Sequence, residues 1–152
     1  SNIWISNPEL RARFRAEVTA AGYSQVNLMG LVACQAAYET GEEWLKELKI
    51  YLEGNLDYVR TFLKENLPEI KLTDMGLFDV TTFSFIPEGT YLLWLDFKSL
   101  GMKEEQLKDL VENKAKLWLD SGAMFGPNGE GFERINIACP REILKQALTQ
   151  LF

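Results

Sequence analysis

The chain has 152 residues, of which 47% are hydrophobic, and this is typical of one domain or of one lobe of a larger globular protein. Its 16 basic and 22 acidic residues give a net charge of −6 without a cluster of Lys and Arg, so we expect no nucleic-acid partner. No apolar run is long enough to cross a bilayer, and the N-terminus has no signal-peptide pattern. We therefore expect a cytoplasmic protein that makes no membrane contact.

The reactive side chains further restrict which kinds of catalytic or metal site the chain can form. The sequence has no histidine, which excludes Ser-His and Cys-His catalysis and leaves few candidate metal ligands. Cys34 and Cys139 lack the CxxC spacing, so we interpret them as reduced, buried thiols. We expect no metal site.

Helices are predicted over the first 66 residues, after a short apolar strand at residues 3–5. The first helix runs from Pro8 to about Ala20, because a capping Asn and a Pro precede an apolar stripe of period four. The second runs from Leu28 to about Thr40 and is rich in Gly and Ala. The third spans residues 42–66 and ends at Leu67-Pro68. At about 1.5 Å per residue this helix is about 35 Å long, which is unusual in a small free-standing domain.

Strand patterns begin after Pro68. Ile70 and Leu72 alternate, and the segment 74–86 contains three phenylalanines. The strongest strand is Thr90–Phe97, which is apolar on both faces and should therefore be central. A helix is predicted from Lys103 to Ala115, an edge strand at Leu117–Leu119, and a Gly- and Pro-rich loop at residues 120–130.

The last strand offers the main candidate binding group. Phe132–Ala138 alternates, so that Ile135 and Ile137 point to one face while Arg134 and Asn136 point to the other. The fork of a guanidinium suits a carboxylate or a phosphate. The alternative is a surface arginine in an antiparallel sheet. After Pro140, apolar residues recur at helical spacing, which predicts a C-terminal helix.

The order of these elements predicts an α+β fold. A helical first half is followed by strands and two more helices, which favours an antiparallel or mixed sheet of three to five strands covered on one side by helices.

Several stretches resemble one family of enzymes. Gly131-Phe-Glu-Arg-Ile-Asn-Ile-Ala-Cys-Pro-Arg141 resembles the C-terminal signature of fold-type I pyridoxal-phosphate (PLP) enzymes, and it is most similar to the MalY/PatB-type cystathionine β-lyases, which are C–S lyases. Further stretches agree with the family in the same order, namely Ser1-Asn-Ile-Trp-Ile-Ser-Asn-Pro-Glu-Leu10, Gly41-Glu-Glu-Trp-Leu45, Tyr51-Leu-Glu-Gly-Asn55, Pro87-Glu-Gly-Thr-Tyr-Leu-Leu-Trp-Leu-Asp-Phe97 and Phe125-Gly126.

The resemblance implies a division into lobes. Residues 1–40 would be the end of the large cofactor-binding lobe, and residues 41–152 the C-terminal small lobe. Within the small lobe, helix 42–66 would join the two lobes, and residues 69–152 would form the sheet and its helices. Enzymes of this family are homodimers, so a homodimer is implied as well.

The resemblance also implies a reaction. Arg134 would bind the α-carboxylate of the amino-acid substrate. Asn136, beside it on the same strand face, is the second candidate substrate-binding residue. The parent enzyme would use PLP for β-elimination of a sulfur amino acid such as cystathionine, giving pyruvate, ammonia and a thiol. An aminotransferase of class I/II would use the same arginine, so that alternative stays open.

Two departures from the family qualify these expectations. The lysine that binds PLP in the family lies in a Ser-Lys-x-Phe-like motif, and no such motif occurs here. Lys98, Lys103, Lys114 and Lys145 read as surface lysines. We therefore expect no catalytic and no cofactor-binding residue in this chain, no PLP bound to it alone, and no activity from it alone.

The second departure is the segment 74–86, which is longer than in the family. It predicts an extra strand or hairpin over a sheet edge, or else a change in the substrate pocket or in an assembly contact. Its phenylalanines also keep open a third function, that of a stand-alone, non-catalytic binding or interaction module derived from the lobe.

Overall fold

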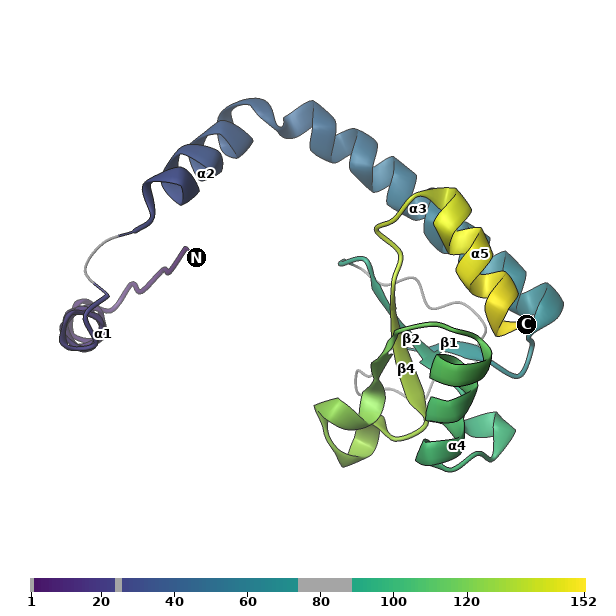
Figure 1. The fold of residues 1–152 in the computed structure, drawn as a ribbon. Helices are drawn as coiled ribbons and strands as arrows, with labels where there is room; N and C mark the ends of the chain where they lie inside the picture. The colour runs from purple at the N-terminus through teal and green to yellow at the C-terminus, as the bar shows by residue number, and fades with distance from the viewer. Residues whose placement is uncertain (1, 24–25, 74–88) are drawn as a thin grey trace. The chain divides into compact units, whose positions relative to one another are not determined.

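A computed structural model describes residues 2–23, 26–73 and 89–152 (Figure 1). The expectations for the segment 74–86 lie outside the described residues, and so does the support that this segment gives to an interaction module. The chain divides into two compact units, Ser1–Lys46 and Glu47–Phe152.

The first unit contains the helices α1 (Pro8–Ala20) and α2 (Leu28–Thr40), with the bounds that the sequence predicts. The side chains of Asn7 and Asn27 cap them, each accepting two backbone N–H groups of the first turn. No residue of either helix is buried. The strand predicted at residues 3–5 is wrong: the carbonyl of Ile5 accepts a hydrogen bond from Arg11 Nη1 at 2.9 Å rather than joining a ladder.

Helix α3 (Glu42–Asn66) begins in the first unit and has most of its length in the second. It ends where Leu67-Pro68 predicts its end. Its buried side chains, Leu56, Val59 and Leu63, recur at helical spacing and form the stripe that faces the core. Asn55 is buried on the same side.

The second unit contains a four-stranded antiparallel sheet in the order β1-β2-β4-β3. The strands are β1 (Lys71–Thr73), β2 (Leu92–Asp96), β3 (Asp120–Ser121) and β4 (Phe132–Asn136). Strand β2 lies between β1 and β4, which confirms the central position predicted from its two apolar faces. Hydrogen bonds from Phe97 N to Gly131 O and from Ile137 N to Tyr91 O extend its pairing with β4 at both ends.

The predicted edge strand at Leu117–Leu119 is wrong in position. The described sheet has β1 and β3 at its edges, and β3 begins at Asp120, one residue after the predicted strand ends. The N–H of Leu117 donates to the carbonyl of Val111 at 2.9 Å, and Lys116 has a positive φ of 56°. The chain at this point therefore closes the preceding helix and cannot pair as a strand.

The helix predicted at Lys103–Ala115 is present in two parts. Helix α4 (Glu104–Lys108) continues into a wider π-helical segment, Asp109–Lys114. The last helix, α5 (Arg141–Leu151), follows Pro140 as expected.

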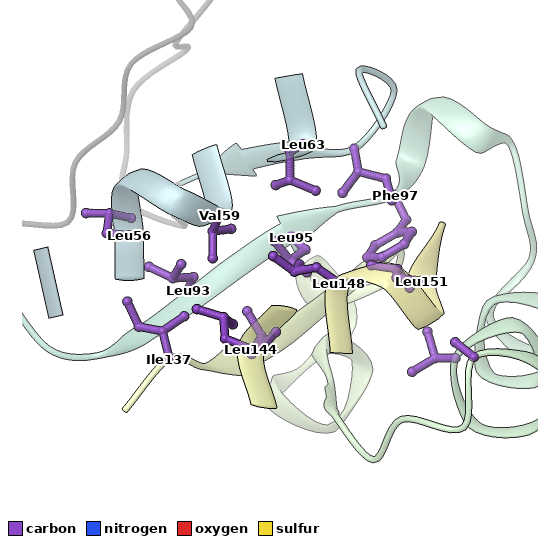
Figure 2. Close-up of a cluster of buried hydrophobic side chains, with 14 of the residues drawn as sticks. Leu56, Val59, Leu63, Leu93, Leu95, Phe97, Ile137, Leu144, Leu148 and Leu151 are labelled. Carbon is purple, nitrogen blue, oxygen red and sulfur yellow. The ribbon is translucent and has the colours of Figure 1, made fainter. Parts of the chain in front are cut away.

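One hydrophobic core joins the sheet to the helices (Figure 2). Side chains from α3, β2 and α5 point toward one another in it, with β4 contributing from the same face of the sheet. Its residues include Val59, Leu63, Leu93, Leu95, Ile135, Ile137, Leu144 and Leu148, all below 5% exposed. The α+β class is confirmed. Among the described residues, no helix has the length and apolar character needed to cross a membrane.

The two cysteines are free, as predicted. The prediction that they are buried is wrong, because both are only partly buried. Cys139 lies past the end of β4, where the chain turns toward α5, and Cys34 lies in α2, which has no buried residue.

Candidate functional site

Arg134 lies in β4 with its side chain on the face opposite the core. Its neighbour Ile135 is buried, whereas the Arg134 side chain is 26% exposed. Its Nε and Nη2 both donate to a single oxygen, Oδ2 of Asp120, at 3.1 and 2.6 Å. Asp120 stands directly opposite Arg134 in the register of β3 and β4. The guanidinium is therefore held by a cross-strand ion pair at the edge of the sheet.

Aromatic rings lie on the same face of the sheet as this ion pair. The guanidinium carbon of Arg134 lies 4.5 Å from the ring centroid of Phe125. Trp94, opposite Arg134 on β2, meets the rings of Phe125 and Phe132 edge-on, with centroids 5.3 and 6.2 Å apart. We call Arg134, Asp120, Phe125, Trp94 and Phe132 the Arg134 cluster. It offers a cation in a partly apolar setting, which suits the carboxylate of a small ligand.

The loop that carries Phe125 is held by glycine contacts. A Cβ on Gly122 would collide with the backbone oxygen of Gly129, and a Cβ on Gly129 would collide with that of Gly122. The two backbones therefore touch in a way that no other residue permits. Glu104 ties the loop at both ends, because its Oε1 accepts the Ser121 hydroxyl at 2.5 Å and its Oε2 accepts the Gly131 N–H at 3.3 Å.

Asn136, the second predicted substrate-binding residue, lies two positions beyond Arg134 and is exposed. Its Oδ1 accepts the backbone N–H of Ala138 at 2.8 Å. The side chain thus forms a local turn at the end of β4. Its described hydrogen bond does not join it to the Arg134 cluster, and its role in substrate binding stays a prediction.

Asn55 anchors the far end of β4, and the sequence reasoning missed this. Its Nδ2 donates to the carbonyls of Ile137 and Cys139 at 2.7 and 3.0 Å, and its Oδ1 accepts Arg141 Nε at 2.6 Å. It is fully buried. A polar residue within the apolar stripe of a long helix was the available signal, because such a residue needs buried partners.

Glu133 is the second residue that was missed. It is 2% exposed and lies between Phe132 and Arg134 on β4. Its pKa is raised from 4.5 to about 7, chiefly by burial and also by the nearby charges of Glu104, Glu112 and Asp120. Strand alternation places Glu133 on the same core-facing side as Ile135, so the sequence pattern could have predicted that Glu133 is buried.

The lysines predicted to lie at the surface are mostly exposed. Lys98, Lys103 and Lys114 are exposed, and Lys145 is half-buried and pairs with Glu142 at 2.8 Å. The ammonium of Lys98 lies 4.1 Å from the ring centroid of Phe132. In the described part of the chain, no three Cys, Asp or Glu side chains are grouped as metal ligands. The Arg134 cluster therefore fits a ligand carboxylate.

Curated relatives resemble the chain along almost its whole length. The cystathionine β-lyase PatB of Bacillus subtilis is 33% identical over 151 residues, which are 99% of this chain and 36% of PatB. The chain thus spans about a third of the length of this relative. No family model matches the sequence.

Solved structures resemble the chain equally well. Cystalysin from Treponema denticola, whose crystal structure contains pyridoxal 5′-phosphate, has a TM-score of 0.87 and 34% identity, over 99% of this chain and 35% of cystalysin. A PLP-bound putative aminotransferase from Clostridium difficile has a TM-score of 0.86 and 35% identity, over 97% of this chain and 35% of that protein.

Proposed function

Because this chain belongs to the family of PatB- and MalY-type PLP-dependent C–S lyases and class I aminotransferases, and corresponds to about its C-terminal third, we propose that it supplies the substrate-carboxylate site of a C–S β-lyase. The observation that carries the proposal is the place of Arg134. Its guanidinium lies on the polar face of a strand whose opposite face is locked into the core, beside aromatic rings and with part of its surface open.

The substrate would be a sulfur-containing amino acid such as cystathionine. Arg134 would bind its α-carboxylate through paired, charge-assisted hydrogen bonds and so fix the direction of the Cα–H bond. Lysine could not reproduce this geometry, because its ammonium is a point charge without a planar fork. Asn136 would contribute a second polar contact to the substrate.

PLP supplies the electron sink that stabilises the Cα carbanion when it is bound in such an enzyme. We propose that groups outside the Arg134 cluster hold it. This chain's own part is to bind and orient the carboxylate, while the ring of Phe125, which packs edge-on against Trp94, covers one face of the guanidinium. Breaking the Cα–H and Cβ–S bonds, followed by hydrolysis, would give pyruvate, ammonia and a thiol.

A class I/II aminotransferase is the second candidate. The likeness to the putative aminotransferase of C. difficile favours it, and a substrate-carboxylate arginine serves both reactions. The two differ in what becomes of the amino group: a lyase releases ammonia, whereas an aminotransferase passes the group to a 2-oxo acid.

The complete enzyme, meaning this chain joined to a large cofactor-binding lobe, would be a homodimer. In support, α2 has no buried residue in its own unit, and Leu28, Met29 and Tyr38 are each more than 70% exposed. Such a surface would be covered by the large lobe or by the partner subunit. Light scattering on the complete enzyme should give the mass of a dimer, and a monomer at micromolar concentration would contradict this.

The test of the function measures pyruvate and ammonia formed from L-cystathionine by the complete enzyme. We expect both products without added 2-oxo acid, and we expect neither product from the 152-residue chain alone mixed with PLP. Turnover that requires a 2-oxo acid would favour the aminotransferase. Pyruvate formation by the isolated chain would overturn the proposal that this chain binds the substrate carboxylate while other groups hold PLP. Stoichiometric visible absorbance from PLP bound to one of its lysines would overturn it as well.

A further inference from the structure

The ion pair between Asp120 and Arg134 occupies one edge of the guanidinium. Nε and Nη2 lie on the same side of the planar group, and both donate to Oδ2 of Asp120, at 3.1 and 2.6 Å. The outer end, formed by Nη1 and the second N–H of Nη2, makes no hydrogen bond within the described part of the chain. A carboxylate that approaches the outer end therefore meets a donor pair whose plane Asp120 already fixes.

Strand β3 and the loop that follows it fix the position of Asp120 beside Arg134. It lies in a strand of only two residues, which pairs Asp120 with Arg134 and Ser121 with Glu133. The backbone contact between Gly122 and Gly129 and the hydrogen bond from Ser121 to Glu104 hold this short strand against β4. Phe125, from the same loop, covers a face of the guanidinium.

The pair contributes little to folding, because the side chain of Asp120 is 44% exposed and that of Arg134 is 26% exposed. Ion pairs with this access to water stabilise a fold only weakly. The arrangement therefore calls for an explanation in terms of the site.

We propose that Asp120 is a positioning residue for Arg134, which holds the guanidinium so that its outer end receives the α-carboxylate of the substrate. This inference rests on the proposed function. Asp120 also repels the substrate carboxylate, because both anions lie beside the same guanidinium. The repulsion is weakened by the access of Asp120 to water, since its side chain is 44% exposed, whereas a displacement of about 1 Å in the bound substrate can cost on the order of 100-fold in rate. We expect orientation to be the larger effect, and the inhibition constants of Asp120→Ala measure the balance of the two.

The test compares variants of the complete enzyme loaded with PLP. Asp120→Ala should lower kcat/KM for L-cystathionine by about tenfold, and Asp120→Asn should recover part of the loss, because its amide oxygen still accepts a hydrogen bond. Glu130→Ala is the matched control, since it removes an exposed carboxylate from the same loop, and it should change kcat/KM less than twofold. Thermal melting checks that each variant folds.

A second readout separates positioning from general damage. We would measure the inhibition constant of a non-reactive amino acid and that of the corresponding amine without its α-carboxylate. Asp120→Ala should weaken the binding of the amino acid by about tenfold and the binding of the amine by less than twofold. Equal weakening of both ligands would show a merely structural role, and tighter binding of the amino acid would show that Asp120 only competes with the substrate. Either result overturns the inference.

Arg134→Ala distinguishes this inference from the proposed function. If that variant keeps full affinity for the amino acid, the proposed carboxylate site fails, and the positioning role of Asp120 fails with it. If Arg134→Ala loses the affinity while Asp120→Ala keeps it, only the positioning role fails.

Discussion

Replacing Asn55 by alanine should destabilise the second unit by about 3 kcal/mol. The side chain is fully buried and makes hydrogen bonds to Ile137 O, Cys139 O and Arg141 Nε. One of these hydrogen bonds is buried and two are partly buried. Each contributes about 1 kcal/mol, and a partner left unsatisfied raises that cost. Asn55→Ala leaves two carbonyls and a guanidinium N–H without their partner, at the point where β4 passes into α5.

Urea denaturation of the 152-residue chain, followed by circular dichroism, measures this effect. With a slope of about 1–2 kcal/mol per molar urea, the midpoint should fall by roughly 1.5–3 M. Glu53→Ala, an exposed position in the same helix, is the control and should stay within about 0.5 kcal/mol of the parent chain. A loss below about 1 kcal/mol for Asn55→Ala would refute the idea that this network anchors β4.

Two further predictions concern β4 and its loop. Because the folded pKa of Glu133 is about 7 against an ordinary 4.5, the folded state keeps this proton where the unfolded state has lost it. Stability should therefore fall by on the order of 2 kcal/mol between pH 4.5 and pH 7, and urea titrations of Glu133→Gln should remove most of that slope; an unchanged slope would count against the assignment. Gly122→Ala should lower kcat/KM of the complete enzyme by tenfold or more, because its Cβ meets the backbone of Gly129. Gly89→Ala, whose Cβ would meet nothing within 4 Å, should have no effect, and equal activity of the two variants would remove the role given to the loop.

The parts of the fold that local signals determine could be predicted from the sequence. The helices α1, α2 and α3 have the expected bounds, because capping Asn residues mark two of their starts and Gly or Pro residues follow their ends. Strand β2 lies inside the sheet because both of its faces are apolar. Arg134 faces away from the core because strand alternation with Ile135 allows nothing else.

The parts that depend on distant contacts could not be predicted in the same way. The partner of Arg134 is Asp120, and this pairing depends on the register of a two-residue strand that a glycine contact across the loop holds in place. Asn55 was in the predicted helix, but its partners lie more than 80 residues away in the sequence.

The measurement that tests the central claim most directly is the kinetics of Arg134→Ala and Arg134→Lys in the complete enzyme with L-cystathionine. Both variants should lose at least about 100-fold in kcat/KM while the visible absorbance of bound PLP stays that of the parent enzyme, because only the substrate carboxylate loses its partner. Full activity of Arg134→Ala with normal cofactor binding would contradict the assignment of Arg134 as the carboxylate-binding residue.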